Sequence, residues 1–199
     1  MERVEQTEAV NDRELVTRCQ EGDESAFDEL VQRHQQRALN VAWQVLRNYE
    51  DATEVAQDAF VSVYRHIGEF RGDSEFRTWL HQIVLNLARN KHRWWKRRGK
   101  AATVSLDCPL PTAEGELARE LASPTDAPDT ALAKGEYVRE IHGAMERLPR
   151  KFREVLVLRN VEELSYEEIA VVLDCSIGTV KSRIARAREA LRERMQMQR

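Results

Sequence analysis

The sequence predicts an all-α protein made of two small helical domains joined by a flexible linker. Three observations support this prediction. Glycine and proline, which interrupt helices, are sparse, at 8 and 5 of the 199 residues. Apolar residues recur at helical spacing through most of the chain, whereas the alternation typical of strands is weak throughout. Four of the five prolines fall within residues 101–135 and divide the helical pattern into two blocks.

The first block is the expected N-terminal domain, residues 12–98, which is predicted to contain four helices. Gly22 ends the first helix, and the third stops before a loop at 68–74. We expect Asp73 or Ser74 in this loop to cap the fourth helix. The predicted helices are 12–21, 24–47, 50–67 and 75–96.

The linker is expected at residues 99–135. Within 101–135, six acidic residues stand against two basic ones and large apolar side chains are few, a composition too poor in apolar surface to form a core. The C-terminal domain, residues 136–195, follows. Ser165 and Glu168 form a Ser-x-x-Glu capping box at the start of its third helix. Its predicted helices are 134–147, 150–160, 165–173 and 177–195.

Composition excludes several classes of protein. No stretch approaches the roughly 18 apolar residues of a membrane span, and residues 1–14 lack the apolar segment of a secretory signal. The three cysteines, Cys19, Cys108 and Cys175, lie far apart. We therefore expect neither a disulfide scaffold nor a zinc site, and no other metal or cofactor. These features are typical of a protein of the reducing cytoplasm.

The formal net charge of −3 conceals a strong segregation of charge along the chain. Residues 86–100 hold seven basic side chains and no acid, and residues 178–199 hold seven basic side chains against two acids. Residues 49–58 hold four acids and no base. A chain with separate poles of each sign can bind a polyanion with one surface and a basic protein with another.

The fourth helix carries the first basic pole. Its predicted core face has apolar residues at steps of 4, 3, 4 and 7, namely Phe76, Leu80, Ile83, Leu87 and Trp94. A polar-basic strip lies roughly 100° around the helix from that face. Its cations can neutralise phosphates, and its asparagine can donate to and accept from a base edge. The alternative is a solvated helix face, but the absence of acids favours nucleic acid. The strip consists of Gln82, Asn86, Arg89, Arg93 and Lys96.

The loop before this helix adds an aromatic residue, Phe70, next to Arg71. An exposed aromatic ring beside a basic helix can stack on an unpaired base, which stabilises binding by about 1–3 kcal/mol. The alternative is that Phe70 packs against the core, the commoner position for a loop aromatic.

The third helix carries an acidic face of Asp51, Glu54 and Asp58, which step by 3 and 4. Like charges at this spacing repel one another, and a basic partner relieves the repulsion. The alternative, which the residues alone favour, is an ordinary solvated face.

Residues 164–184 read as helix, short turn, helix, the pattern of a DNA-reading helix-turn-helix. Val180 and Ile184 point to the core, whereas Lys181, Ser182, Ala185 and Arg186 point outward. The two small residues allow close approach to a groove wall, and the two cations then reach guanine edges or phosphates. Asp174 stands at the turn position that glycine often fills. The alternative is a helical hairpin that only packs.

Four runs in the chain resemble the extracytoplasmic-function (ECF, group IV) sigma factors of bacteria, above all those of the envelope-stress type. In chain order they are DAFVSVY at 58–64, FRGDSEFRTWL at 70–80, LSYEEIA at 164–170 and GTVKSRIARAREAL at 178–191. The match covers nearly the whole chain, with a variable linker where the family has one.

The resemblance implies a subunit of bacterial RNA polymerase that supplies promoter recognition and melting, and no enzymatic activity of its own. Its implied partners are core RNA polymerase, promoter DNA and an anti-sigma factor, with no small-molecule substrate. Residues 12–98 correspond to sigma domain two, in which Asn86 matches a position that contacts a flipped-out base of the −10 element and Phe70 lies in the capturing loop. The acidic face falls where the family docks on the clamp helices of the polymerase. The −10 residues implied are Phe70, Arg71, Asn86, Arg89, Arg93 and Lys96.

Residues 136–195 correspond to sigma domain four, which reads the −35 element. Thr179, Lys181, Ser182 and Arg186 match its reading helix, and Arg159 matches a position that contacts the DNA backbone. Lys181 replaces a common arginine and therefore lacks the bidentate fork of a guanidinium. Ala185 replaces an aromatic residue of close relatives, so the −35 preference is expected to differ from theirs.

Two other classes of function compete with this interpretation. An enzyme would need a phosphate loop, a metal motif or a nucleophile elbow, and the five histidines are scattered without evident partners. A helix-turn-helix repressor would need a sensor domain or a dimerisation helix, and the N-terminal block has the signature of neither. Promoter-dependent run-off transcription with core polymerase distinguishes a sigma factor from a repressor.

Overall fold

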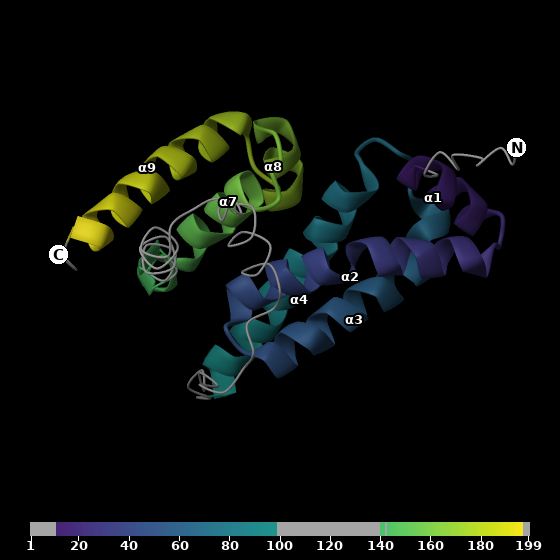
Figure 1. The fold of residues 1–199 in the computed structure, drawn as a ribbon, viewed down its shortest axis with the longest axis horizontal. Helices are drawn as coiled ribbons and strands as arrows, with labels where there is room; N and C mark the ends of the chain where they lie inside the picture. Colours follow the sequence, from purple (N-terminus) through teal and green to yellow (C-terminus); the bar gives the residue numbers. More distant parts are fainter. Residues whose placement is uncertain (1–10, 99–139, 142, 197–199) are drawn as a thin grey trace, which may run out of the picture.

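The computed structural model describes residues 11–98 and 140–196, apart from residue 142 and the side chain of Lys96. Within these ranges every regular element is a helix. The N-terminal unit contains α1 (Asp12–Gln20), α2 (Glu24–Leu46), α3 (Tyr49–His66), the 3₁₀ turn η1 (Ile67–Glu69) and α4 (Phe76–Arg98). The C-terminal unit contains α7 (Arg150–Asn160), α8 (Tyr166–Leu173) and α9 (Ile177–Gln196), preceded by helical residues at 140–141 and 143–146. Figure 1 shows the two groups of helices side by side.

The helices begin and end where local chemistry dictates. Asn11, Asp23 and Asn48 cap α1, α2 and α3, each accepting a backbone N–H of the first turn. The predicted ranges therefore agree with the observed helices to within two residues, except that the helix expected at 134–147 lies partly outside the described residues. The predicted cap of α4 is wrong. Because the helix begins at Phe76, Glu75 holds the N-cap position, and its carbonyl accepts the N–H of Trp79 at 3.2 Å.

The N-terminal unit is a bundle in which α2, α3 and α4 pack on one another and α1 packs on α2. Small and β-branched side chains of α3 lie against α2, which lets the helices approach closely; Ala52, Ala59 and Val63 are fully buried. The predicted core face of α4 is right for Phe76 and Leu80, but wrong for Trp94. The Trp94 side chain is 38% exposed, with the Arg98 guanidinium over its ring, and Trp95 is the buried tryptophan.

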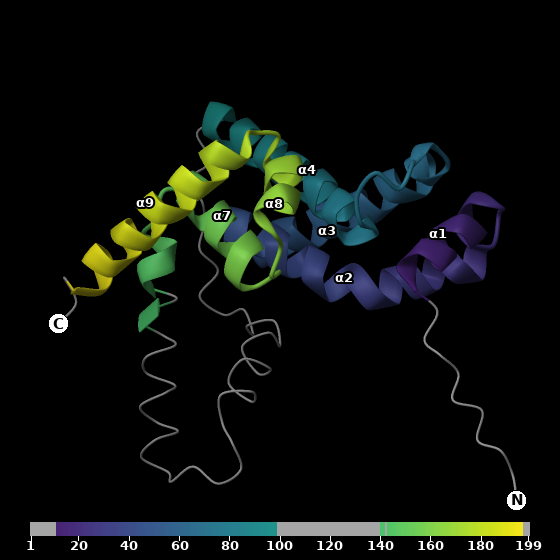
Figure 2. The same ribbon diagram turned by 90° about the horizontal axis from the view of Figure 1, so that it is seen from above.

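The C-terminal unit contains the predicted helix-turn-helix, α8 followed by α9. The capping box is present: Ser165 Oγ accepts the N–H of Glu168 at 3.1 Å, and Glu168 Oε2 accepts the N–H of Ser165 at 2.7 Å. Asp174 ends α8 in the left-handed region at φ 51°, a conformation that aspartate tolerates better than most residues. α9 packs on α7 and α8, and its last turn lies at the opposite end of the molecule from α1 (Figures 1 and 2).

The two units pack against each other. α8 contacts α4, and α7 contacts α2, so that buried apolar residues of both units join in one continuous core. The sequence predicts two tethered modules and contains no signal for this packing, because each module by itself has the pattern of an amphipathic bundle.

Candidate nucleic-acid and polymerase interfaces

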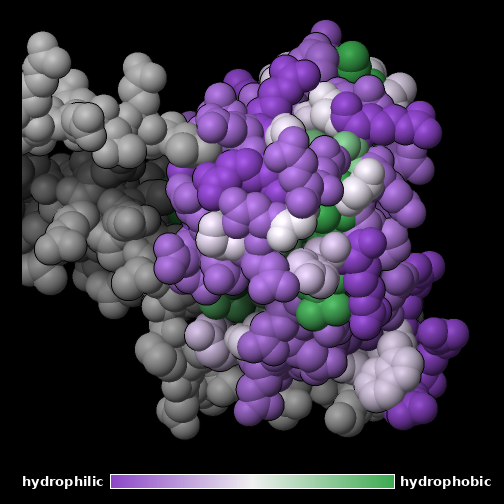
Figure 3. Space-filling view, turned by 90° about the vertical axis from the view of Figure 1, so that its right-hand side faces the viewer, coloured by the Kyte–Doolittle hydropathy of each residue, from purple (hydrophilic) through white to green (hydrophobic). Residues whose placement is uncertain are grey.

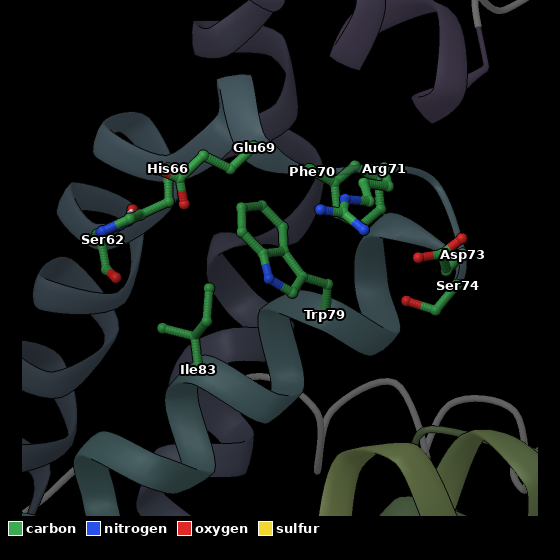
Figure 4. A pocket seen from close by; sticks show the side chains of 9 residues that line it. All are labelled: Ser62, His66, Glu69, Phe70, Arg71, Asp73, Ser74, Trp79 and Ile83. Atoms are coloured by element: carbon green, nitrogen blue, oxygen red, sulfur yellow. Dashed lines mark hydrogen bonds between the residues drawn. The ribbon is translucent and has the colours of Figure 1, made fainter.

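A pocket of about 610 Å³ opens beside the start of α4 (Figure 4). The loop at 70–75 forms one wall, α3 and η1 form another, and α4 forms the base with Trp79 at its centre. Charged and hydroxyl groups stand around the aromatic base. The lining residues are Ser62, His66, Glu69, Phe70, Arg71, Asp73, Ser74, Trp79 and Ile83.

The aromatic base of the pocket is built by stacking. Phe70 stacks on Trp79, with ring centroids 4.7 Å apart and the ring planes inclined by 28°, and Phe76 meets both rings edge-on. Gln20 of α1 donates to the carbonyls of Ile67 and Phe70 at 2.8 and 2.9 Å, which fixes the loop above α4. Phe70 is therefore half-buried: it packs on Trp79 and also lines the pocket, so neither of the two alternatives for this residue describes it completely.

The polar-basic strip of α4 divides into two parts. Asn86 and Arg93 are exposed, on the side of the helix that continues from the pocket. Gln82 and Arg89 point toward the C-terminal unit instead. The Gln82 amide donates to the carbonyl of Val171 at 3.2 Å, and the Arg89 guanidinium binds both carboxylate oxygens of Glu154, at 2.8 and 3.3 Å. Lys96, the last member of the strip, has its side chain outside the described part.

The acidic face of α3 has a partner within the chain. Lys91 of α4 places its Nζ 2.9 Å from Asp51 and forms a second ion pair with Glu54. Asp58 is exposed one turn further along. The repulsion expected between the three carboxylates is therefore relieved in part by Lys91.

The outward face of α9 is open to solvent. Lys181, Ser182, Ala185 and Arg186 are exposed, while Val180, Ile184 and Ala187 are buried. Thr179 is half-buried, and its hydroxyl bonds with that of Ser176 at 2.9 Å at the start of the helix. Arg159 is also half-buried: it donates to the carbonyl of Leu164 at 2.8 Å and stacks on Tyr166, so it braces the turn before α8.

Three important residues were not identified from the sequence. Trp79 is not singled out there, yet it forms the centre of the pocket; its place three and seven residues before Gln82 and Asn86 was an available signal. Lys91 and Glu154 have no such signal, because their partners lie on other helices.

The surface at the α1 end of the molecule is mainly hydrophilic, with small and separate hydrophobic patches (Figure 3). In the described residues, no group of three or more histidine, cysteine, aspartate or glutamate side chains is arranged to hold a metal ion. None of the described helices combines the length and apolar character of a membrane span.

An exposed basic recognition helix in one unit, together with a basic strip beside an aromatic pocket in the other, defines a helical DNA-binding protein. Comparison with protein families refines this class. Residues 30–99 match the model for sigma-70 region 2, and residues 138–191 match the model for sigma-70 region 4. The chain belongs to the ECF RNA polymerase sigma factors of the sigma-70 family.

Two curated relatives cover nearly the full length. The RNA polymerase sigma-H factor of Pseudomonas aeruginosa is 40% identical over 93% of this chain and 94% of its own. The ECF RNA polymerase sigma-E factor of Escherichia coli K12 is 37% identical over 96% of this chain and 97% of its own. The resemblance inferred from the sequence motifs is therefore confirmed.

Solved structures support the fold. CnrH in complex with the cytosolic domain of CnrY is similar with a TM-score of 0.63 and 29% identity, over 92% of this chain and 95% of that one. The sigma factor RpoE of Bartonella quintana, in complex with the anti-sigma factor NepR, gives a TM-score of 0.65 at 21% identity, over 87% and 98% of the two chains.

Proposed function

We propose that residues 12–98 dock this sigma factor on core RNA polymerase and open the −10 element, that residues 136–195 read the −35 element, and that residues 99–135 tether the two. The chain then acts as an initiation factor in the cytoplasm and contributes no catalytic group. The single observation that carries the proposal is the aromatic pocket lying next to the exposed Asn86 on α4.

The pocket supports capture of one flipped-out base. Extrusion of a base from the duplex costs a few kcal/mol, and stacking on an aromatic ring returns about 1–3 kcal/mol. Trp79 and Phe70 offer that aromatic surface, while Arg71, Asp73 and Ser74 at the rim offer donors and acceptors. Asn86 presents an amide that can pair with a base edge in both directions, and Arg93 beyond it can neutralise a phosphate.

The open face of α9 supports recognition of the −35 element in the major groove. The small Ser182 and Ala185 permit close approach of the backbone, and Lys181 and Arg186 extend from the exposed side. Arg159 and Thr179 act in this proposal mainly by holding the turn and the start of the helix, since both already have partners within the protein.

The acidic face supports docking on a basic surface of the polymerase. Lys91 neutralises part of the charge of Asp51 and Glu54, so the exposed Asp58 offers the carboxylate with the greatest freedom to pair with a partner. Once the polymerase holds both units at a fixed spacing, two weak DNA contacts act together through a raised effective concentration.

A protein partner that covers these surfaces is also proposed. CnrH, 29% identical, was solved with the cytosolic domain of CnrY bound. The equivalent partner of this chain is an anti-sigma factor that competes with the polymerase.

Transcription in vitro tests the proposed function. Core RNA polymerase mixed with the purified protein should start transcripts at discrete sites on chromosomal DNA, and core polymerase alone should not. Failure of the protein to bind core polymerase contradicts the proposal, as does initiation that is independent of promoter sequence.

Replacing Arg186 by alanine is expected to weaken −35-dependent binding of the holoenzyme about ten-fold and to reduce its salt dependence by about one counterion. Arg13→Ala removes the same charge from the exposed surface of α1 and should change neither quantity. Filter binding over a salt series measures both. An unchanged slope for Arg186→Ala contradicts its assignment to the DNA surface.

Reversing the charge of Asp58 with lysine is expected to weaken binding to core polymerase about ten-fold, because it opposes like charges across the interface. Asp28→Lys makes the same change on the exposed side of α2 and serves as the control. Competition with a labelled sigma factor for core polymerase gives the relative affinities. Equal affinities for the two variants contradict docking through the acidic face.

A further inference from the structure

The recognition helix α9 begins with an exposed apolar side chain. Ile177 is the first residue of the helix and is 38% exposed. Helical phase places it at the edge of the buried face that Val180, Ile184 and Ala187 form. In a helix-turn-helix, the N-terminal residues of the second helix are those that contact base edges. Ile177 therefore presents a branched apolar side chain at the end of α9 that enters the groove.

Ile177 shares one edge of α9 with Lys181. The two residues are four positions apart, so their side chains are about 40° apart around the helix axis and about 6 Å apart along it. Lys181 is exposed as well. A docking of α9 that brings Lys181 over a base edge therefore brings Ile177 over another, one or two base steps of about 3.4 Å away.

The polar side chains of the first turn are engaged within the helix. The hydroxyls of Ser176 and Thr179 bond to each other at 2.9 Å, and Ser176 Oγ also accepts the N–H of Thr179 at 3.2 Å. One turn later, the Ser182 hydroxyl donates to the carbonyl of Thr179 at 3.0 Å. Because these hydroxyl protons are directed into the helix, sequence-dependent contact by the first turn falls to Ile177.

The surface next to Ile177 permits close approach. Gly178 is exposed, and a Cβ built there would meet Ser176 Oγ at 3.9 Å, an ordinary contact distance in an otherwise open place. The exposed Ser182 and Ala185 continue this low surface along α9. Apolar contact acts only over short distances, so a side chain that reads by such contact needs a surface of this kind beside it.

The chemistry of isoleucine selects one feature of the major groove. Thymine presents a C5 methyl group there, whereas guanine, adenine and cytosine present hydrogen-bonding groups at their major-groove edges. Isoleucine has no polar atom in its side chain, so over those groups it displaces water without replacing the lost hydrogen bonds. Against a thymine methyl group it buries apolar surface on both sides, which strengthens binding about four-fold per methyl group.

We propose that Ile177 is a specificity residue of α9 that reads the C5 methyl group of a thymine in the −35 element, one or two base steps from the base pair that Lys181 contacts. This inference rests on the proposed role of α9. The Lys181 ammonium group is a compact charge without the fork of a guanidinium, and it binds guanine edges and phosphates alike. Ile177 adds a discrimination between bases that this charge lacks.

The first experiment selects the −35 sequence with the holoenzyme. The probe is a pool of duplexes that keep the −10 region of a promoter mapped by transcription in vitro and carry about ten random base pairs, roughly one turn, in the −35 region. We expect the parent to enrich a thymine at one position and Ile177→Ala to lose the preference at that position alone. Val161→Ala shortens an exposed side chain of the C-terminal unit outside α9 and should select the parental sequence.

The second experiment removes the methyl group from the DNA. In the selected duplex the thymine is replaced by deoxyuridine, which differs only by the missing C5 methyl group, and fluorescence anisotropy gives the Kd of the holoenzyme. The replacement should weaken binding by the parent about four-fold and have no effect on Ile177→Ala. Lys181→Ala should bind both duplexes more weakly and keep the four-fold ratio. Because each ratio compares two duplexes on one protein, a partial loss of folded protein cancels.

The outcomes separate this inference from the proposed function. If the parent selects no thymine, or if Ile177→Ala keeps either the thymine preference or the four-fold ratio, reading by Ile177 is overturned. In that case a changed selection for Arg186→Ala leaves the proposed role of α9 standing. If Arg186→Ala and Ile177→Ala both select the parental sequence with parental affinity, α9 does not read the −35 element, and the proposed function of the C-terminal unit fails as well.

Discussion

Replacing Asn86 by alanine is expected to reduce promoter opening by about ten- to a hundred-fold while leaving the affinity for core polymerase unchanged. A paired amide contact to a base edge contributes about 1–3 kcal/mol of discrimination, and this contact forms only after the base has left the stack. Loss of the amide is therefore expected to destabilise the melted complex. Asn86 is exposed, so the fold should be unaffected.

Fluorescence of 2-aminopurine placed in the −10 element measures opening directly, and competition with a labelled sigma factor measures affinity for the core enzyme. Asn40→Ala on α2, which removes an amide that accepts a hydrogen bond from the Gln36 side chain at 3.1 Å, is the matched control. If Asn86→Ala loses core binding and opening together, the residue belongs to the polymerase surface and its assignment to the flipped base is wrong.

Replacing His81 and replacing Glu162, the two members of a buried pair, are expected to have opposite effects on pH dependence. The property that depends on pH is closure, the packing of the two units against each other. His81 Nε2 lies 3.3 Å from Glu162 Oε2, although without hydrogen-bond geometry, and the two side chains are 1% and 3% exposed. Burial lowers the pKa of His81 to about 3, with His34, Arg37 and Arg77 adding to the effect and Glu168 opposing it. Burial raises the pKa of Glu162 to about 7, against the influence of Arg37 and Arg77.

The direction of each pH dependence follows from the number of protons that the open and closed states bind. With Glu162→Gln, only His81 remains, so closure is strongest above pH 6.5 and weakens as the pH falls, because the histidine of the open state takes up a proton. With His81→Gln, only Glu162 remains, so closure is strongest below pH 4.5 and weakens as the pH rises toward 7. Each pKa unit is about 1.4 kcal/mol. Two pH units should therefore change the ratio of open to closed molecules about a hundred-fold in either variant.

The parent protein should respond much less between about pH 5.5 and 7.5. Up to about pH 6 the pair carries close to one proton in both states, on His81 when open and on Glu162 when closed, and as the pH rises further both states lose that proton over nearly the same range, so the two dependences nearly cancel. Small-angle X-ray scattering measured between pH 5 and 8 tests all three proteins in the same buffers. Parallel pH profiles for the two variants contradict the assignment of these groups to the interface.

Local signals in the sequence determined the helices well. The asparagine and aspartate caps, Gly22 and the Ser165–Glu168 capping box each act within a few residues of themselves, and the observed helices follow them closely. The cap of α4 was predicted wrongly because several capping residues stand together in the 68–75 loop. Trp94 was placed in the core because periodicity alone cannot tell which of two adjacent tryptophans faces inward at the end of a helix.

The candidate sites were predicted less completely. Exposure of Asn86, Lys181 and Arg186 follows from helical phase, because the opposite faces are apolar. The role of Trp79 at the base of the pocket could not be predicted without knowing how the loop before α4 folds. The path of that loop is held by Gln20, which lies on another helix.

By itself the sequence determined an all-α chain, its family and the residue types on each exposed helix face, because these depend on local propensity, helical phase and motif. Only the tertiary structure decided that Lys91 neutralises Asp51 and Glu54, and that Glu154 holds Arg89. Those pairings join residues on separate helices, and their formation depends on burial and on distances that no local pattern encodes.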